Sequence, residues 1–147
     1  MDLALDFYKA LQKADIVIDT PGLKIDDTLK NAVIISIYSD RRANSDDVLE
    51  LNENPRGWFA DSFNPVRNDK IGSRLWLLRR AKLINDTLIK AREYVLESLR
   101  WLIDVNTAQS TNVDTFIYNQ YTLGIYIEII KPSGTDVFNF QYAWDNL

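Results

Sequence analysis

The strongest candidates for acid–base chemistry in this sequence are carboxylates. The 147 residues contain no histidine and no cysteine, so imidazole bases, thiolate nucleophiles, disulfides and the usual zinc ligands are excluded. Two carboxylates that face one another can act as a general acid and a general base. The candidates are Asp26, Asp27, Asp46, Asp47, Glu53 and Asp61. Proximity in sequence does not show a shared site, and helix capping or solvation explains these residues more simply.

Other catalytic and cofactor patterns are missing as well. Ser62 and Ser73 have no histidine to activate them. Asp46, Asp47 and Glu50 lack the glycine-containing loop of a calcium site. None of the five glycines lies in a phosphate-binding loop of recognised spacing. We therefore expect a protein with no enzyme activity, no cofactor and no metal site.

The stretch RGWFADSF, residues 56–63, gathers apolar and charged side chains in a region bounded by two prolines. Proline excludes a long helix or a central strand there. Trp58 and Phe59 either plug the core of the domain, with Arg56 and Asp61 paired above them, or they face a partner. Trp and Arg are the residue types most often found as interface hot spots. The residues alone leave both interpretations open.

Composition favours a soluble globular protein. The chain has 46% hydrophobic and 26% charged residues and a net charge of −4, and its length suits one domain, residues 1–147. An acidic chain is a poor nucleic-acid binder, and no apolar run is long enough to span a membrane. Asp2 and Asp6 stand where a signal peptide has a basic flank. We expect a protein that is used in the cytoplasm or in a particle assembled there.

Helical spacing predicts about three helices. The first contains Leu29, Val33, Ser36 and Ile37, with a cap at Asp26-Asp27-Thr28 and Arg41-Arg42 near its end. The second follows Asn68-Asp69 and contains Ile71, Leu75 and Leu78. The third, capped by Asn85-Asp86-Thr87, has the clearest stripe, formed by Leu88, Ala91, Val95, Leu99 and Leu102. Trp76 and Trp101 are expected in the core, and residues 43–69 form a long loop.

Alternation predicts strands at both ends of the chain. Residues 3–7 and 16–19 form a hairpin that ends at Thr20-Pro21-Gly22, or the segment YKALQKA extends a helix from the N-terminus. Three C-terminal strands are expected around Val113–Ile117, Leu123–Ile129 and Phe138–Trp144, with a turn at 131–134 between the last two. The predicted fold class is α+β, with the helices packed on a C-terminal antiparallel meander.

Several segments together resemble the small baseplate protein family of Mu-like contractile-tailed phages and prophages. They are LALDF (3–7), AVIISIYSDRRA (32–43), RGWFADSF (56–63), IGSRLWLLRRAKL (71–83) and A-x-x-Y-x-x-E-S-L-x-W-L ending at Leu102. This family is related to a wedge protein family with a lysozyme-like name. The related family carries a Glu-Pro-Arg motif after its long helix, and that motif is absent here at residues 101–105.

The resemblance implies a structural subunit of the tail baseplate, located in the virion and assembled in the host cytoplasm. It implies several copies in an inner wedge ring, bound to larger wedge subunits and to the tail sheath protein, with hub, spike or tube proteins as further candidate partners. We expect Arg56, Trp58, Phe59, Asp61 and Arg74 to form the site that binds the wedge subunit, with Trp58 packed partly inward and with Arg56 and Asp61 fixing the loop for the contact. The edge of the last strand, with Val137, Phe138, Phe140 and Tyr142, is expected to accept a strand of the first sheath ring.

Two other classes of function remain open. A cell-wall hydrolase predicts a cleft with a carboxylate pair, and the missing histidine weighs against it. An isolated regulatory binding module predicts a stable monomer without a ring partner, and the full-length resemblance weighs against that.

Overall fold

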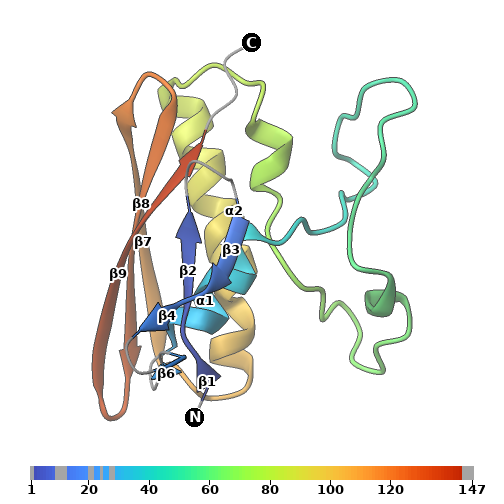
Figure 1. The fold of residues 1–147 in the computed structure, drawn as a ribbon. Coiled ribbons are helices and arrows are strands. Elements are labelled where there is room, and N and C mark those ends of the chain that lie inside the picture. The colour runs from blue at the N-terminus through green and yellow to red at the C-terminus, as the bar shows by residue number, and fades with distance from the viewer. Residues whose placement is uncertain (1, 9–12, 20–21, 24, 27–28, 144–147) are drawn as a thin grey trace.

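A computed structural model describes residues 2–8, 13–19, 22–23, 25–26 and 29–143 (Figure 1). At its centre, helix α2 (Asn85–Asp104) packs on a three-stranded antiparallel sheet in the order β7-β8-β9. The strands are β7 (Ser110–Asn119), β8 (Thr122–Lys131) and β9 (Gly134–Ala143). The predicted α+β class, the long helix and the C-terminal meander are confirmed. The tip at Trp144 lies outside the described residues.

The core lies between the sheet and α2, because both elements present one apolar face to it. Along β8, the side chains of Leu123, Ile125, Ile127 and Ile129 are fully buried. The apolar stripe of α2 meets them, and its residues Ala91, Val95, Leu99 and Leu102 are also fully buried. The alternation and the helical stripe in the sequence therefore identify the two faces of the core. The turn between β8 and β9 leaves Pro132 and Ser133 as its two loop residues.

Helix α1 (Lys30–Tyr38) is buried on more than one side. It packs against α2 and also contacts the N-terminal strands, and Val33, Ile34 and Ile37 are at most 1% exposed. The predicted cap at Asp26-Asp27-Thr28 is wrong for Asp26, which lies in a strand, and the N-cap is Leu29. Residues 27 and 28 lie outside the described residues. The helix ends at Tyr38, before Arg41-Arg42, because the chain then turns into an extended segment.

The second predicted helix is replaced by a short 3-10 helix, η3 (Leu75–Leu78). Residues 70–73 are not helical, because Gly72 has a φ of +93° and Ser73 forms a parallel bridge with Asp40. That tertiary contact outweighs the local helical spacing. Leu75 and Leu78 are still buried as predicted, and Trp76 joins them with 4% exposure. Trp101 is half-buried and packs against the core.

The N-terminal segment forms a narrow β-ribbon. Strand β2 (Leu5–Tyr8) pairs with β3 (Lys13–Ile16), which confirms a hairpin near the predicted place. Short pairs of β1 (Asp2–Leu3) with β6 (Ile25–Asp26), and of β4 (Ile18–Asp19) with β5 (Gly22–Leu23), extend the ribbon. Asn31 of α1 fixes it by accepting a hydrogen bond from the Leu5 amide (2.8 Å) and donating one to the Leu3 carbonyl. The predicted turn residues Thr20 and Pro21, and the centre of YKALQKA, lie outside the described residues.

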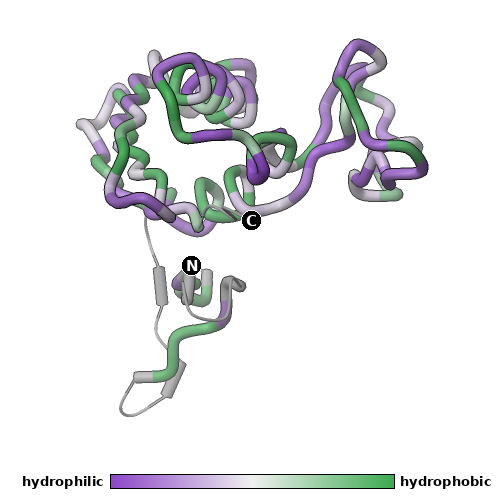
Figure 2. Tube along the Cα trace, turned by 90° about the horizontal axis from the view of Figure 1, so that it is seen from above, coloured by the Kyte–Doolittle hydropathy of each residue, from purple (hydrophilic) through white to green (hydrophobic). Residues whose placement is uncertain are grey.

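Residues 43–69, called the loop arm below, leave the body of the molecule between α1 and η3. Figure 1 shows the arm on the side opposite the sheet, and Figure 2 shows the same separation after a quarter turn. Its regular structure is a single 3-10 turn, η2 (Phe59–Ser62). The long loop predicted from polarity and proline content is confirmed. Within the described residues, no helix is long and apolar enough to cross a bilayer.

Candidate functional site

The base of the loop arm is built on the extended segment 39–42 that follows α1. Ser73 donates its amide to Ser39 and accepts from the Arg41 amide, both at 2.9 Å, and its hydroxyl donates to the Ile37 carbonyl. A side chain at Gly72 would lie 2.4 Å from the Ser39 carbonyl oxygen. Only glycine allows so close a backbone approach at this position.

Gly57 has the same role on the other side of this segment. Its φ is +95°, and a Cβ there would lie 2.6 Å from the Arg42 Cβ. The Ala43 amide donates to the Pro55 carbonyl at 2.9 Å. Gly57 in the loop arm and Gly72 just after it thus let the chain approach segment 39–42 closely at two places.

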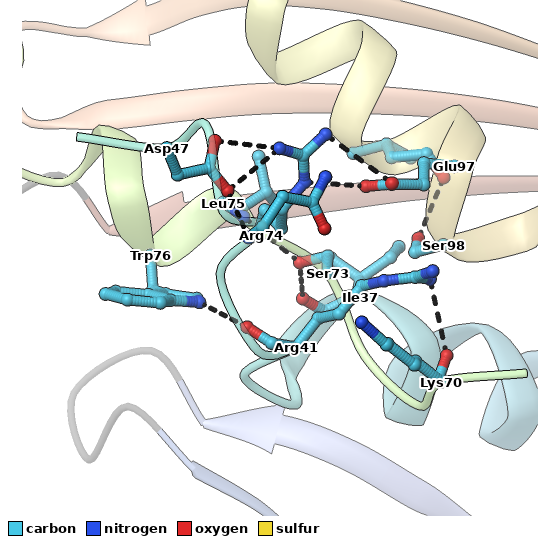
Figure 3. A network of polar contacts seen from close by, with 12 residues as sticks. Ile37, Arg41, Asp47, Lys70, Ser73, Arg74, Leu75, Trp76, Glu97 and Ser98 are labelled. Atoms are coloured by element: carbon cyan, nitrogen blue, oxygen red, sulfur yellow. Dashed lines mark hydrogen bonds and ion pairs between the residues drawn. The ribbon is translucent and has the colours of Figure 1, made fainter. Parts of the chain in front are cut away.

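Arg74 is held inside the protein (Figure 3). Its guanidinium donates to both oxygens of Asp47 at 2.8 and 3.0 Å and to Glu97 at 2.9 Å, and it lies 4.4 Å over the Tyr94 ring. Burial alone would lower the pKa of Arg74, but the hydrogen bonds and charges of Glu97 and Asp47 outweigh it and raise that pKa. Arg74 therefore joins the loop arm to α2.

Arg56 pairs with Asp40 rather than with Asp61. The Arg56 Nη1 lies 2.6 Å from an Asp40 oxygen, and the guanidinium lies 4.3 Å over the Trp76 ring. The Trp76 indole donates to the Arg41 carbonyl at 2.8 Å. The pairing of Arg56 with Asp61 considered from sequence is wrong, because the positive φ of Arg56, 56°, and its place beside segment 39–42 direct it elsewhere.

Trp58 and Phe59 form an exposed pair on the loop arm. Trp58 is 53% exposed and Phe59 75%, and their rings lie 5.8 Å apart in an edge contact. Asp61 stands behind them, where its Oδ1 accepts from the Ile71 amide at 3.4 Å. These residues do not plug the core of the described protein. Their exposure fits the docking interpretation, which stays a prediction.

Sequence reasoning missed further apolar residues that the loop arm exposes. Val48 and Leu51 are more than 90% exposed, and Phe63 and Val66 are 80% and 61% exposed. The signal available was their hydrophobic type inside a segment too rich in proline and polar residues to form its own core. The ion pairs of Asp40, Asp47 and Glu97 were missed because their arginine partners are distant in sequence.

The residues expected on β9 fall on its two faces. Val137 points outward and is 49% exposed, whereas Phe140 is buried at 9% exposure and Phe138 packs on the core. Tyr142 stacks on Tyr38 with ring centroids 5.9 Å apart. The three aromatic side chains therefore contribute to the core from an edge strand. Only main-chain groups and outward side chains remain for contact with another protein.

One hydrogen bond shows which main-chain N–H and C=O groups of β9 point away from β8. The Gln141 carbonyl accepts from the Tyr38 hydroxyl at 2.8 Å, so this carbonyl faces away from β8. Because N–H and C=O groups alternate in direction along an antiparallel strand, Thr135, Val137 and Asn139 also present theirs to the free edge. No described strand pairs with that edge. At the opposite edge, Arg92 covers the Val113 carbonyl with a hydrogen bond of 2.6 Å.

The described residues contain no group of three or more acidic, histidine or cysteine side chains that could hold a metal ion. At the base of the loop arm, Arg56 pairs with Asp40, and Arg74 is shared between Asp47 and Glu97. Burial, followed by the charge of Tyr142, raises the pKa of Tyr38, which keeps its hydroxyl a hydrogen-bond donor. The arrangement suits binding through exposed apolar side chains and a strand edge.

Comparison with known proteins gives consistent matches. The chain is 37% identical over 137 residues to the baseplate protein gp46 of Escherichia phage Mu, covering 92% of each chain. It is 35% identical over 144 residues to the Mu-like prophage FluMu protein gp46 of Haemophilus influenzae, covering 97% of each. The family model described as phage protein GP46 matches residues 29–136, from the start of α1 into β9. The resemblance to Mu-like phage proteins is confirmed, and the chain belongs to the phage protein GP46 family.

Proposed function

We propose that this protein is a structural subunit of a contractile phage tail baseplate that binds a larger wedge subunit through its loop arm and starts sheath assembly through the β9 edge. The relative from phage Mu is named as a baseplate protein, and this name supports the assignment to a baseplate. The observation that best supports the docking role is the apolar surface that the loop arm exposes. Ion pairs hold the base of this arm.

The exposed surface of the arm is more apolar than folding requires. Val48, Leu51, Phe59 and Phe63 are each at least 75% exposed, and burying one such side chain contributes roughly 1.5–3 kcal/mol. A monomer gains nothing from that exposure. The salt bridges Arg74–Asp47 and Arg56–Asp40 tie the arm to the body of the protein at residues 47 and 56, which reduces the entropy cost of binding.

The β9 edge supports the second part of the proposal. Thr135, Val137 and Asn139 offer a short row of main-chain donors and acceptors, and all three residues are exposed. An extended segment of a sheath subunit gains main-chain hydrogen bonds by joining such a row. The Tyr38 hydroxyl already occupies the Gln141 carbonyl. An added strand would therefore stop pairing with β9 before Gln141.

The test is co-expression with the large wedge subunit of the same tail, with the mass of the purified complex read by light scattering. We expect a defined complex, and we expect Trp58→Ala to weaken it by about 2 kcal/mol, or about thirtyfold in Kd, as for an interface hot spot. Tyr121→Ala is the matched control, because Tyr121 is 54% exposed at the far turn of the sheet.

Two results would count against the docking role. Trp58→Ala protein that folds and binds like wild type would remove Trp58 from the contact. A wild-type monomer that ignores the wedge subunit would reject the proposed function itself and favour an isolated binding module.

A further inference from the structure

Two arginines of this protein are held in the same way, by an aromatic ring together with carboxylates. Arg56 lies 4.3 Å over Trp76 and 2.6 Å from Asp40. Arg74 lies 4.4 Å over Tyr94 and pairs with two carboxylates. A planar guanidinium suits this arrangement because it stacks on a ring face while its N–H groups bond the carboxylate.

A third set of rings and carboxylates lines a cavity whose lining contains no arginine. The cavity measures about 350 Å³ and lies between α1, α2 and the base of the loop arm. Trp58, Trp101, Ile35 and Ile71 supply apolar walls, and Asp61 supplies a carboxylate. The composition resembles that of the sites of Arg56 and Arg74, except that the lining contains no arginine.

The polar groups of this cavity are held in place by hydrogen bonds, but one carboxylate oxygen has no hydrogen-bond donor. The Trp101 indole donates to the Ser36 hydroxyl at 3.0 Å, which fixes its ring. Asp61 Oδ1 accepts from the Ile71 amide, whereas Asp61 Oδ2 is shielded from solvent and has no hydrogen-bond partner. A buried oxygen without a donor costs about 1–3 kcal/mol. A donor that enters the cavity recovers that free energy.

Lys70 is the cation already present in the lining, but it does not complete the site. It forms no ion pair with Asp61 or Asp69, the two carboxylates of the cavity, among the described residues. The Asp69 carboxylate instead accepts from the Asn64 amide at 2.9 Å. Neither carboxylate of the cavity is therefore in direct contact with the ammonium group of Lys70.

We propose that this cavity binds an arginine side chain of a neighbouring protein, with the guanidinium bonded to Asp61 and its face against Trp58. Because Asp61 Oδ2 is shielded, the wall must shift as the cation enters. Trp58, half exposed on the loop arm, has room to move. The identity of the neighbour as a baseplate subunit rests on the proposed function, whereas the preference for arginine rests on the cavity alone.

A small probe tests the preference without any partner protein. Nα-acetyl-arginine methylamide is titrated into ¹⁵N-labelled protein, and the indole N–H signals of Trp58 and Trp101 are followed by NMR. We expect both signals to shift saturably, while Trp76 stays unchanged. The neutral citrulline analogue should bind about tenfold more weakly, because it lacks the charge that Asp61 attracts. Asp61→Asn should abolish that difference, and the exposed Asp46→Asn should preserve it.

Equal binding of the arginine and citrulline probes, or no saturable shift, would overturn the inference. If Asp61→Asn fails to fold, Ile35→Arg and Ile35→Gln replace it, because Ile35 lies on the cavity wall with 41% exposure. The arginine variant should fill the site and exclude the probe, and the glutamine variant should not. Equal probe binding by both variants would also overturn the inference.

Co-purification with the large wedge subunit separates this inference from the proposed function. A wild-type complex that forms although the arginine probe does not bind would reject the cavity inference alone. Saturable probe binding that Asp61→Asn weakens, with no complex formed, would support the cavity inference and reject the proposed function.

Discussion

At the scale of single residues, charged side chains of this protein are used to hold the base of the loop arm. Arg74 is the central one, since it contacts Asp47 on the arm and Glu97 on α2. The side chains of Arg74 and Asp47 are 15% and 10% exposed. A pair so shielded is costly to break, because removing one partner leaves the other charge buried.

Arg74→Ala is therefore expected to destabilise the protein by about 3 kcal/mol. Arg74→Lys should cost less, since it keeps the charge and loses the two-pronged geometry. Urea unfolding followed by tryptophan fluorescence measures both. Arg100→Ala, an exposed arginine on α2, should change stability by less than about 0.5 kcal/mol. Arg74→Ala protein as stable as wild type would show that Arg74 is not a structural residue and would return it to the expected contact residues.

Because the pKa of Tyr38 is raised in the folded state, we expect the protein to lose stability at high pH. Burial raises the pKa of this hydroxyl in the folded state, whereas the unfolded value is about 10. The folded state thus keeps a proton that the unfolded state releases. The contribution of Tyr38 to the free energy of unfolding is therefore full below pH about 10 and falls above it. We expect the free energy of unfolding to fall by up to about 1.4 kcal/mol per pH unit for this one proton.

Tyr38→Phe should flatten the pH dependence measured by urea unfolding between pH 9 and 12. It should also cost about 1 kcal/mol at neutral pH, because the Gln141 carbonyl loses its donor. Tyr121→Phe changes an exposed tyrosine and serves as the control. An unchanged alkaline slope in Tyr38→Phe would contradict the assignment to this residue.

At the scale of elements, the accuracy of sequence prediction depended on whether local or distant contacts decide the structure. Helix α2 and strands β7 to β9 follow from their own periodicity, because one face of each meets the core. The predicted helix beginning near Asn68-Asp69 failed, because Gly72 and Ser73 pack on a segment more than thirty residues earlier. Spacing within a window cannot report such a contact.

In the candidate site too, features that depend on local sequence were predicted and features that depend on distant contacts were missed. The aromatic and arginine content of RGWFADSF identified an unusual loop, and the exposure of Trp58 and Phe59 fits a docking role. The partner of Arg56 was missed, since Asp40 lies sixteen residues away across a turn of the chain. The aromatic side chains of β9 were expected at an interface and lie largely in the core, because alternation alone does not tell which face an edge strand buries.

At the scale of the whole molecule, the two proposed contact surfaces lie on opposite sides of the helices. The sheet is on one side in Figure 1 and the loop arm on the other, and Figure 2 shows the same separation. A subunit that links a wedge to a sheath needs two surfaces that both partners can occupy together. The proposal therefore predicts that changes in one surface leave the other contact intact.

Val137→Pro tests this separation. It removes an N–H that points to the free edge of β9 and spares the ladder with β8, so the fold should persist, as for proline elsewhere on edge strands. We expect wedge binding to be unchanged and sheath growth on baseplates, seen by electron microscopy, to stop. Val137→Ala keeps the N–H and should leave sheath growth normal. Trp58→Ala should have the converse effect of Val137→Pro, because it weakens wedge binding and leaves the β9 edge unchanged. Sheath of normal length on Val137→Pro baseplates would refute strand addition at this edge, and sheath lost together with wedge binding would refute the independence of the two surfaces.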